Sequence, residues 1–284
     1  MITLKPFAAL RPQTALAASV AARPYDVLNS QEAAEEAQGN PNSFLHVTKA
    51  EINLPAGTDI HSQSVYDQAK QNLEAMIRKE ALFQESKPCY YIYELVMNGR
   101  SQTGLVALSS VADYNNDLIK KHEFTRPEKE KDRIDHMRTI RAQTGNVFLA
   151  YREVADMDRL IEHWKQAHSP VYSFTASDEI THRIWVVDMR ETVEAITHIF
   201  AEQVPATYIA DGHHRAASAA KVADQLPDSD DAKFFLTTLF PANQLAILDY
   251  NRVVKDLNGH SDGDLLSALQ DDFTLTRETE PVKP

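Results

Sequence analysis

The chain has 284 residues, of which 43% are hydrophobic and 25% are charged, as is typical of a globular protein. Its 41 acidic and 29 basic residues give a formal net charge of −12. Because binding to nucleic acid needs a basic surface, this charge disfavours DNA and RNA as partners and favours a small molecule. A single cysteine, Cys89, excludes an internal disulfide and a cysteine-rich zinc module. No apolar run reaches the roughly 18 residues of a membrane span, so we expect a cytoplasmic protein.

Helices and strands alternate along the chain, which predicts an α/β or α+β fold with mixed sheets and surrounding helices. The clearest helix is expected at residues 64–84, where apolar residues recur every four positions from Val65 to Ile77. Asn98-Gly99 between two β-rich runs predicts a hairpin of strands 90–97 and 103–108. Other extended segments are expected at 25–28, 44–47, 146–151, 171–174, 182–188, 206–210, 234–240 and 245–248. Other helices are expected from about residue 31, in the second half of 118–141, and at 157–166, 191–202, 216–225 and 263–271.

No sharp linker interrupts this pattern. We therefore expect residues 1–284 to form one compact unit, or two intimately packed subdomains with a boundary near residues 113–128.

The run Asp211-Gly212-His213-His214-Arg215 stands between an expected strand and an expected helix. A glycine lets the backbone approach a ligand closely, and the start of a helix offers free N–H groups to an anion. Arg215 supplies a planar charged fork for phosphate oxygens, the two histidines can add donors, and Asp211 can cap the helix, orient a histidine or hold a metal. A polar helix cap without function is the alternative, but such a cluster favours a phosphate- or nucleotide-binding turn.

A second polar group comes earlier in the chain. His122 and Glu123 stand side by side, and several cations follow within two helical turns, among them Lys131 and Arg133. Glu123 could accept a proton from a hydroxyl nucleophile, and either cation could neutralise phosphate charge. On spacing alone, a solvated helix with surface ion pairs explains these residues better.

In the segment Arg23-Pro24-Tyr25-Asp26, the proline ring fixes φ of Pro24. The chain is therefore expected to be extended where it enters Tyr25 and Asp26. Asp26 could reach a ligand and Tyr25 could stack on a base, whereas a turn with a packed tyrosine explains the segment equally well.

The strand, the Asp-Gly-His-His-Arg turn and the helix together resemble the ParB/sulfiredoxin-fold proteins that include free serine kinases. A closer similarity is to a bacterial group of unknown function related to those kinases. It covers residues 23–29, 122–125 with 131–133, 209–215 and 249–254, and thus spans nearly the whole chain. The resemblance implies a ParB/sulfiredoxin-like nucleotide-binding core, and it favours a functional role for the segment from His122 to Arg133 over a solvated helix. Because serine kinases of this fold use a glutamate of the N-terminal region as the base, the resemblance also makes Glu32 a candidate, although Glu123 is the stronger one. Arg252 resembles a basic residue of a later motif, with a surface arginine as the equal alternative. Because members of that group usually continue further, the resemblance also implies that a C-terminal region of the relatives is missing here.

These observations predict a kinase that phosphorylates a small hydroxyl compound, with free L-serine the substrate that the resemblance implies. ATP or ADP, or CTP in their place, would serve with Mg²⁺ as cofactors. The predicted catalytic residues are Glu123, Asp26 and His122, and the predicted nucleotide contacts are Asp211, Gly212, His213, His214, Arg215, Lys131 and Arg133. The partners would be this small molecule and the nucleotide, with a homodimer as an alternative to a monomer.

Two other functions compete. A ParB-like switch would bind the nucleotide without phosphorylating a metabolite. A metal-dependent hydrolase would use His122, Asp211, His213 and His214, but the side chains of adjacent histidines diverge from a helix start and do not readily chelate one ion.

Overall fold

The computed structural model describes residues 1–248 and 254–277. The chain divides into two units, Met1–Gln244 and Leu245–Pro284. Residues 113–128 lie within the first unit, where they include the helix α5 and the strand β6.

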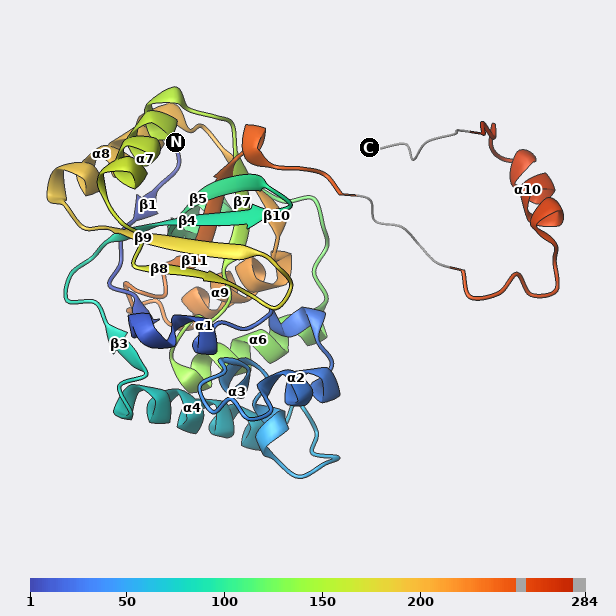
Figure 1. Cartoon of the computed structure of the whole chain (residues 1–284), viewed down its shortest axis with the longest axis horizontal. Helices are drawn as coiled ribbons and strands as arrows, with labels where there is room; N and C mark the ends of the chain where they lie inside the picture. Colours follow the sequence, from blue (N-terminus) through green and yellow to red (C-terminus); the bar gives the residue numbers. More distant parts are fainter. Residues whose placement is uncertain (249–253, 278–284) are drawn as a thin grey trace. The chain divides into compact units, whose positions relative to one another are not determined.

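A mixed nine-stranded sheet forms the centre of the first unit, with the order β6-β10-β7-β11-β5-β4-β9-β8 and with β1 paired to β5 (Figure 1). β10 runs parallel to β6 and antiparallel to β7, while β7 runs parallel to β11. The strands are β1 (Leu4–Lys5), β4 (Tyr90–Met97), β5 (Arg100–Ser110), β6 (Ile119–Lys120), β7 (Val147–Tyr151), β8 (Tyr172–Thr175), β9 (Thr181–Val187), β10 (Thr207–Asp211) and β11 (Phe234–Pro241). A separate two-stranded sheet pairs β2 (Leu10–Pro12) with β3 (Leu82–Gln84).

Helices surround this sheet, so the predicted α/β class is confirmed. The α-helices are α1 (Ala17–Val20), α2 (Ser30–Ala37), α3 (Leu45–Thr48), α4 (Gln63–Arg78), α5 (Val111–Asn115), α6 (Pro127–Ile140), α7 (Ala155–Ala167), α8 (Arg190–Gln203), α9 (His213–Gln225) and, in the second unit, α10 (Asp262–Gln270). The 3₁₀ turns are η1 (Thr14–Leu16), η2 (Tyr25–Val27), η3 (Ala50–Asn53) and η4 (Ala242–Gln244). None of the described helices is both long and apolar enough to cross a membrane.

One apolar core joins the sheet to α7, α8 and α9. Along β7, the side chains of Val147, Leu149 and Tyr151 are buried, while those between them are half-buried, as expected when successive residues of a strand face opposite sides. Phe200 of α8 and Ala216 of α9 belong to the same buried cluster. The start of α9 is therefore fixed against the ends of β7 and β10.

A second apolar cluster packs the N-terminal helices onto α6. Val65, Ala69 and Leu73 of α4 meet Ile140 at the end of α6. This packing holds α6 beside α4 on one side and α9 on the other (Figure 1).

The predicted hairpin is confirmed: β4 and β5 pair antiparallel up to Met97 and Arg100. Asn98 and Gly99 have φ of 51° and 76°, the left-handed pair that a two-residue hairpin turn requires.

Four local predictions are wrong. Residues 44–47 were expected as a strand but enter α3, because a short apolar run fits a buried helical turn as well as a strand. The segment at 25–28 begins with the turn η2 rather than an extended piece. The helix expected to residue 84 ends at Arg78, where Glu80 takes a left-handed φ of 57° and the chain turns into β3. Residues 245–248 form no strand.

Candidate functional site

The turn between β10 and α9 has the predicted strand-turn-helix form. Gly212 precedes the helix with a left-handed φ of 95°, and no side chain caps the helix start. A Cβ at this glycine would lie 3.2 Å from Cζ of Arg215 and 3.3 Å from Cα of Val147, so the turn needs glycine for both conformation and space. The first intrahelical bond runs from the Ala216 N–H to the Gly212 carbonyl at 3.0 Å. The preceding N–H groups thus form an uncapped, positively polarised helix start.

Arg215 ties three segments of the chain together at this turn. Its Nη1 donates to the backbone carbonyl of Asn146, and its Nη2 contacts the carboxylates of Asp211 at 2.7 Å and Asp26 at 3.4 Å. The arginine side chain is only 14% exposed, whereas those of Asp211 and Asp26 are 68% and 40% exposed. One guanidinium therefore holds two accessible carboxylates beside the helix start.

The loop of residues 121–126 crosses the same place and contacts both histidines. The N–H of His122 donates to Nε2 of His213 at 3.4 Å, and the N–H of Arg126 donates to Nε2 of His214 at 3.0 Å. Nδ1 of His213 lies 3.4 Å from Oε2 of Glu123. The loop thus brings Glu123 to the start of α9.

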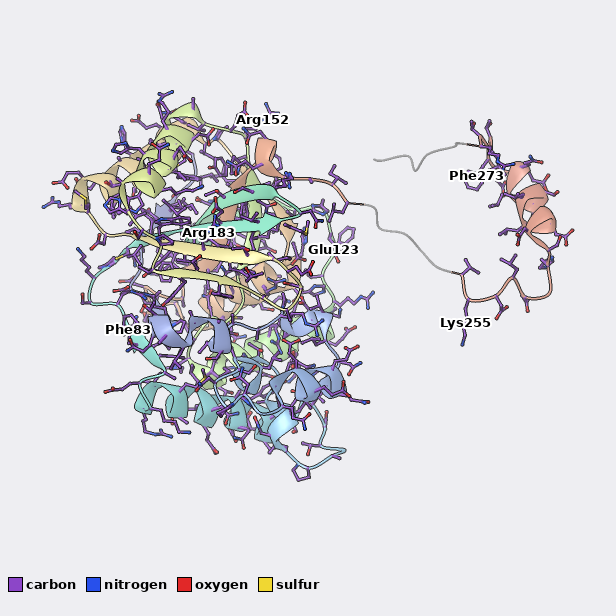
Figure 2. The ribbon with its side chains drawn as sticks, viewed as in Figure 1. Phe83, Glu123, Arg152, Arg183, Lys255 and Phe273 are labelled. Atoms are coloured by element: carbon purple, nitrogen blue, oxygen red, sulfur yellow. The ribbon has the colours of Figure 1, made fainter. Side chains whose placement is uncertain are left out.

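His213 is a neutral imidazole in this setting. Its side chain is buried, and burial together with the neighbouring His122 ring, 4.5 Å away between centroids, lowers the pKa of His213. An imidazole nitrogen that accepts a backbone N–H carries no proton, so the proton of His213 lies on Nδ1, the nitrogen 3.4 Å from Oε2 of Glu123. In contrast, the side chain of Glu123 is 57% exposed at the surface (Figure 2).

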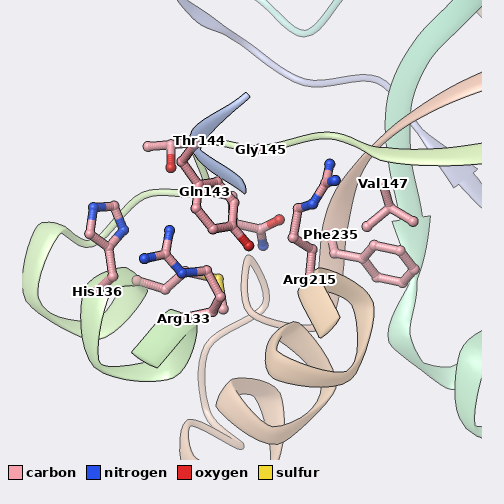
Figure 3. Close-up of a pocket in the computed structure, with 10 residues that line it drawn as sticks. Arg133, His136, Gln143, Thr144, Gly145, Val147, Arg215 and Phe235 are labelled. Carbon is pink, nitrogen blue, oxygen red and sulfur yellow. The ribbon is translucent and has the colours of Figure 1, made fainter. Parts of the chain in front are cut away.

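A cavity opens next to Arg215, between α6, α9 and the loop that precedes β7 (Figure 3). Its empty volume, open solvent included, is ≈ 390 Å³. Its lining comprises Tyr25, Arg133, His136, Met137, Gln143, Thr144, Gly145, Val147, Arg215 and Phe235.

The polar side chains of the cavity wall are fixed by their own contacts. Arg133 lies over the ring of Tyr25, 4.0 Å from its centroid, and Arg133 Nε donates to Asp132 at 2.8 Å. Gln143 bridges to β11, where its Nε2 donates to the Phe234 carbonyl at 2.9 Å. His136 lies 3.1 Å from the Val47 carbonyl through Nε2, and burial lowers the pKa of His136 to about 4, so this ring is also neutral.

A family model described as "Protein of unknown function (DUF1015)" matches residues 4–284. The chain belongs to the DUF1015 family. No curated protein and no solved structure matches it. The resemblance to ParB, sulfiredoxin and the free serine kinases is not among these matches and stays a prediction. Residues 249–253 of the fourth similar segment, which include Arg252, lie outside the described residues.

Most of the predicted site residues of this DUF1015 chain meet at the start of α9, although they are far apart in the sequence. Asp26, His122 and Glu123 all reach the Asp211–Arg215 turn, and Arg133 shares the adjacent cavity with Arg215. Lys131 is not part of this group, because its exposed ammonium pairs with Asp135 at 2.5 Å. Glu32 serves as a helix cap, where its carboxylate accepts the Asn29 N–H at 2.8 Å.

Three residues of the site have no local signal in the sequence. His136, Gln143 and Asn146 enter it because α6 and the following loop pass beside α9. Single polar residues in a charged helix or a loop do not differ from ordinary surface residues until their neighbours from other segments are known.

Negative charge predominates at the turn. The carboxylates of Asp26 and Asp211 share the guanidinium of Arg215, Glu123 lies beside His213, and the nearby Arg133 is paired with Asp132. Within residues 1–248 and 254–277, no three His, Cys, Asp or Glu side chains are grouped so as to hold a metal ion. Nε2 of both His213 and His214 is already engaged, which weighs against the metal-dependent hydrolase.

Proposed function

We propose that this DUF1015 chain binds a nucleotide together with Mg²⁺ at the start of α9 and transfers a phosphoryl group to a small hydroxyl compound. The observation that carries the proposal is the uncapped start of α9, with Arg215 and the carboxylates of Asp26, Asp211 and Glu123 gathered around it. Free L-serine is the acceptor that the resemblance to serine kinases implies.

The helix start supports binding of the phosphates. The N–H groups of the Gly212 turn carry no side-chain cap, and the helix dipole adds positive potential at the same end. Arg215 adds a planar donor fork whose geometry suits phosphate oxygens. Because Asp26 and Asp211 already occupy Arg215, phosphate oxygens would replace carboxylate oxygens as its partners.

The carboxylates support a requirement for Mg²⁺. Two carboxylates that share one guanidinium leave a net negative charge beside Arg215, which repels an unaccompanied polyphosphate. Asp26 and Asp211 are the residues that would hold the ion, since Mg²⁺ in nucleotide sites is usually bound by one or two carboxylates together with the phosphates. The ion would neutralise phosphate charge during transfer.

Glu123 is the better of the two predicted bases. Asp26 already contacts the Arg215 guanidinium at 3.4 Å, whereas Glu123 contacts the neutral His213 ring and leaves most of its carboxylate open to an acceptor. Its exposed carboxylate would accept the hydroxyl proton of the acceptor. The cavity lined by Arg133 and Arg215 opens beside the phosphate site, where a small acceptor would approach.

Calorimetry and a transfer assay test this function. ATP, ADP and CTP are titrated with and without Mg²⁺ into the wild type, the Arg215→Ala variant and a control variant, Arg190→Ala, which alters an exposed arginine on α8. We expect Mg²⁺-dependent binding that the Arg215 variant loses and the control keeps. Each nucleotide that binds is then incubated with the protein and L-serine or other small hydroxyl compounds, and products are identified by mass spectrometry.

The outcomes separate the competing functions. Phosphorylation of the hydroxyl compound supports the kinase. Binding without transfer to any acceptor, accompanied by nucleotide-dependent dimerisation in light scattering, identifies a ParB-like switch instead. Equal nucleotide affinity in the wild type and the Arg215 variant would rule out the phosphate site at α9.

A further inference from the structure

Two consecutive histidines of α9 bind the main chain of the same loop. His213 and His214 each use Nε2 to accept a backbone N–H, from His122 at 3.4 Å and from Arg126 at 3.0 Å. The loop is also held by its Thr125 side chain, which hydrogen-bonds the Glu130 carboxylate of α6. The stretch that carries Glu123 is thus fixed on both sides.

These bonds determine where the histidine protons lie. A backbone N–H can only donate, so the Nε2 atom opposite it must offer a lone pair. Each ring in this arrangement is neutral and carries its proton on Nδ1. Nδ1 of His213 lies 3.4 Å from Oε2 of Glu123, so one ring contacts both the backbone of the loop and the carboxylate of the loop.

We propose that His213 and His214 are positioning residues: as neutral, Nδ1-protonated rings they hold loop 121–126 across the start of α9, and His213 thereby fixes the carboxylate of Glu123. The positioning of a base rests on the proposed function, but the attachment of the loop does not. The two rings are thereby assigned to the loop rather than to phosphate.

The first test measures the protons directly on the intact wild-type chain. Two-bond ¹H–¹⁵N NMR spectra of uniformly ¹⁵N-labelled protein at neutral pH distinguish a protonated from an unprotonated ring nitrogen. We expect unprotonated Nε2 and protonated Nδ1 in His213 and His214, with signals assigned by their loss in the His→Gln variants. Nε2-protonated or doubly protonated rings at neutral pH would overturn the proposal.

The second test follows the loop amides. Hydrogen exchange at His122 and Arg126 is compared in the wild type, in His213→Leu, in His214→Leu, and in a control, His198→Leu, which alters an exposed histidine of α8. Loss of one hydrogen bond should speed exchange of its amide roughly three- to tenfold. His213→Gln and His214→Gln retain an acceptor near the Nε2 position and should restore part of the protection. Exchange unchanged in the leucine variants, or equally fast in the control, would overturn the proposal.

The third test separates positioning from binding. In the transfer reaction, His213→Leu should lower kcat while the Mg²⁺–nucleotide affinity stays within about twofold of the wild type. A loss of nucleotide affinity with unchanged kcat would return His213 to the phosphate site. If no nucleotide binds at all, the proposed function fails, whereas the tautomer and exchange results still decide whether the histidines hold the loop.

Discussion

Replacing Arg215 by alanine should affect both stability and ligand binding, and the two effects have separable sources. The guanidinium donates to the Asn146 carbonyl in a poorly exposed position, which is a charge-assisted hydrogen bond worth about 1.5–3 kcal/mol. Its ion pairs with Asp26 and Asp211 add little, because both carboxylates are substantially exposed and screened by water. We therefore expect the free energy of unfolding to fall by about 1.5–3 kcal/mol.

Thermal and urea unfolding measure this loss. For a chain of this size, about 1 kcal/mol corresponds to a shift in Tm of roughly 2–4 °C, so Arg215→Ala should melt about 3–12 °C below the wild type. Arg215→Lys keeps the positive charge but loses the planar guanidinium, so its Tm should lie between those of the wild type and Arg215→Ala. A urea midpoint lowered without a change in slope would place the loss in the folded state.

The effect on binding follows from the same fork. Loss of its phosphate contacts should weaken Mg²⁺–nucleotide binding by about 10- to 100-fold, measured by calorimetry at a temperature where both proteins are folded. Arg190→Ala supplies the background, since that arginine is exposed and pairs only with Glu194. An Arg215→Ala protein that matches this control in both Tm and affinity would refute the role of Arg215 in the turn and in the site.

Four further changes test neighbouring parts of the site. Asp26→Asn removes one repelling charge and should raise nucleotide affinity without Mg²⁺ while lowering the gain that Mg²⁺ gives; an unchanged Mg²⁺ dependence in calorimetry would exclude Asp26 as a ligand. Glu123→Gln should abolish transfer yet leave nucleotide affinity within about twofold, so a normal kcat would rule it out as the base. Gly212→Ala should cost about 1–2 kcal/mol in urea unfolding, because φ is positive and a Cβ would crowd backbone 3.3 Å away; wild-type stability would contradict this strain. His136 has a pKa of about 4 in the folded protein, whereas its pKa in the unfolded chain is the ordinary 6.5. Its contribution to the free energy of unfolding is therefore fully present above pH 6.5 and should fall by about 1.4 kcal/mol per pH unit as the pH drops towards 4. His136→Gln should reduce this slope.

The local parts of the fold could be predicted from the sequence. The Asn98-Gly99 turn and the glycine before α9 each require a backbone conformation that few residues adopt, so their positions were readable from residue type alone. The prediction of a strand at 44–47 was wrong because no residue there requires a particular backbone conformation. Leu45 and Val47 are both fully buried, and a short buried apolar run fits a helix as well as a strand.

The site was predictable as a set of residues but not as a set of contacts. The polar character of Glu123 and of Asp211–Arg215 marked two segments, yet no spacing rule says that a loop crosses the helix start and donates its N–H groups to the imidazoles. The same holds for Asn146, which binds Arg215 through its backbone carbonyl, so its side chain carries no sign of that role. Contacts between distant segments depend on the packing of α6 against α9.

The attachment of loop 121–126 has a consequence for sequence divergence within the family. Because the histidines bind the main chain, the residue types at 122 and 126 are not constrained by these bonds, except that proline, which has no N–H, is excluded at both positions. Positions 213 and 214, in contrast, must keep a side chain with an acceptor at the right distance. Relatives that preserve the loop should therefore avoid proline at 122 and 126 and hold 213 and 214 nearly invariant.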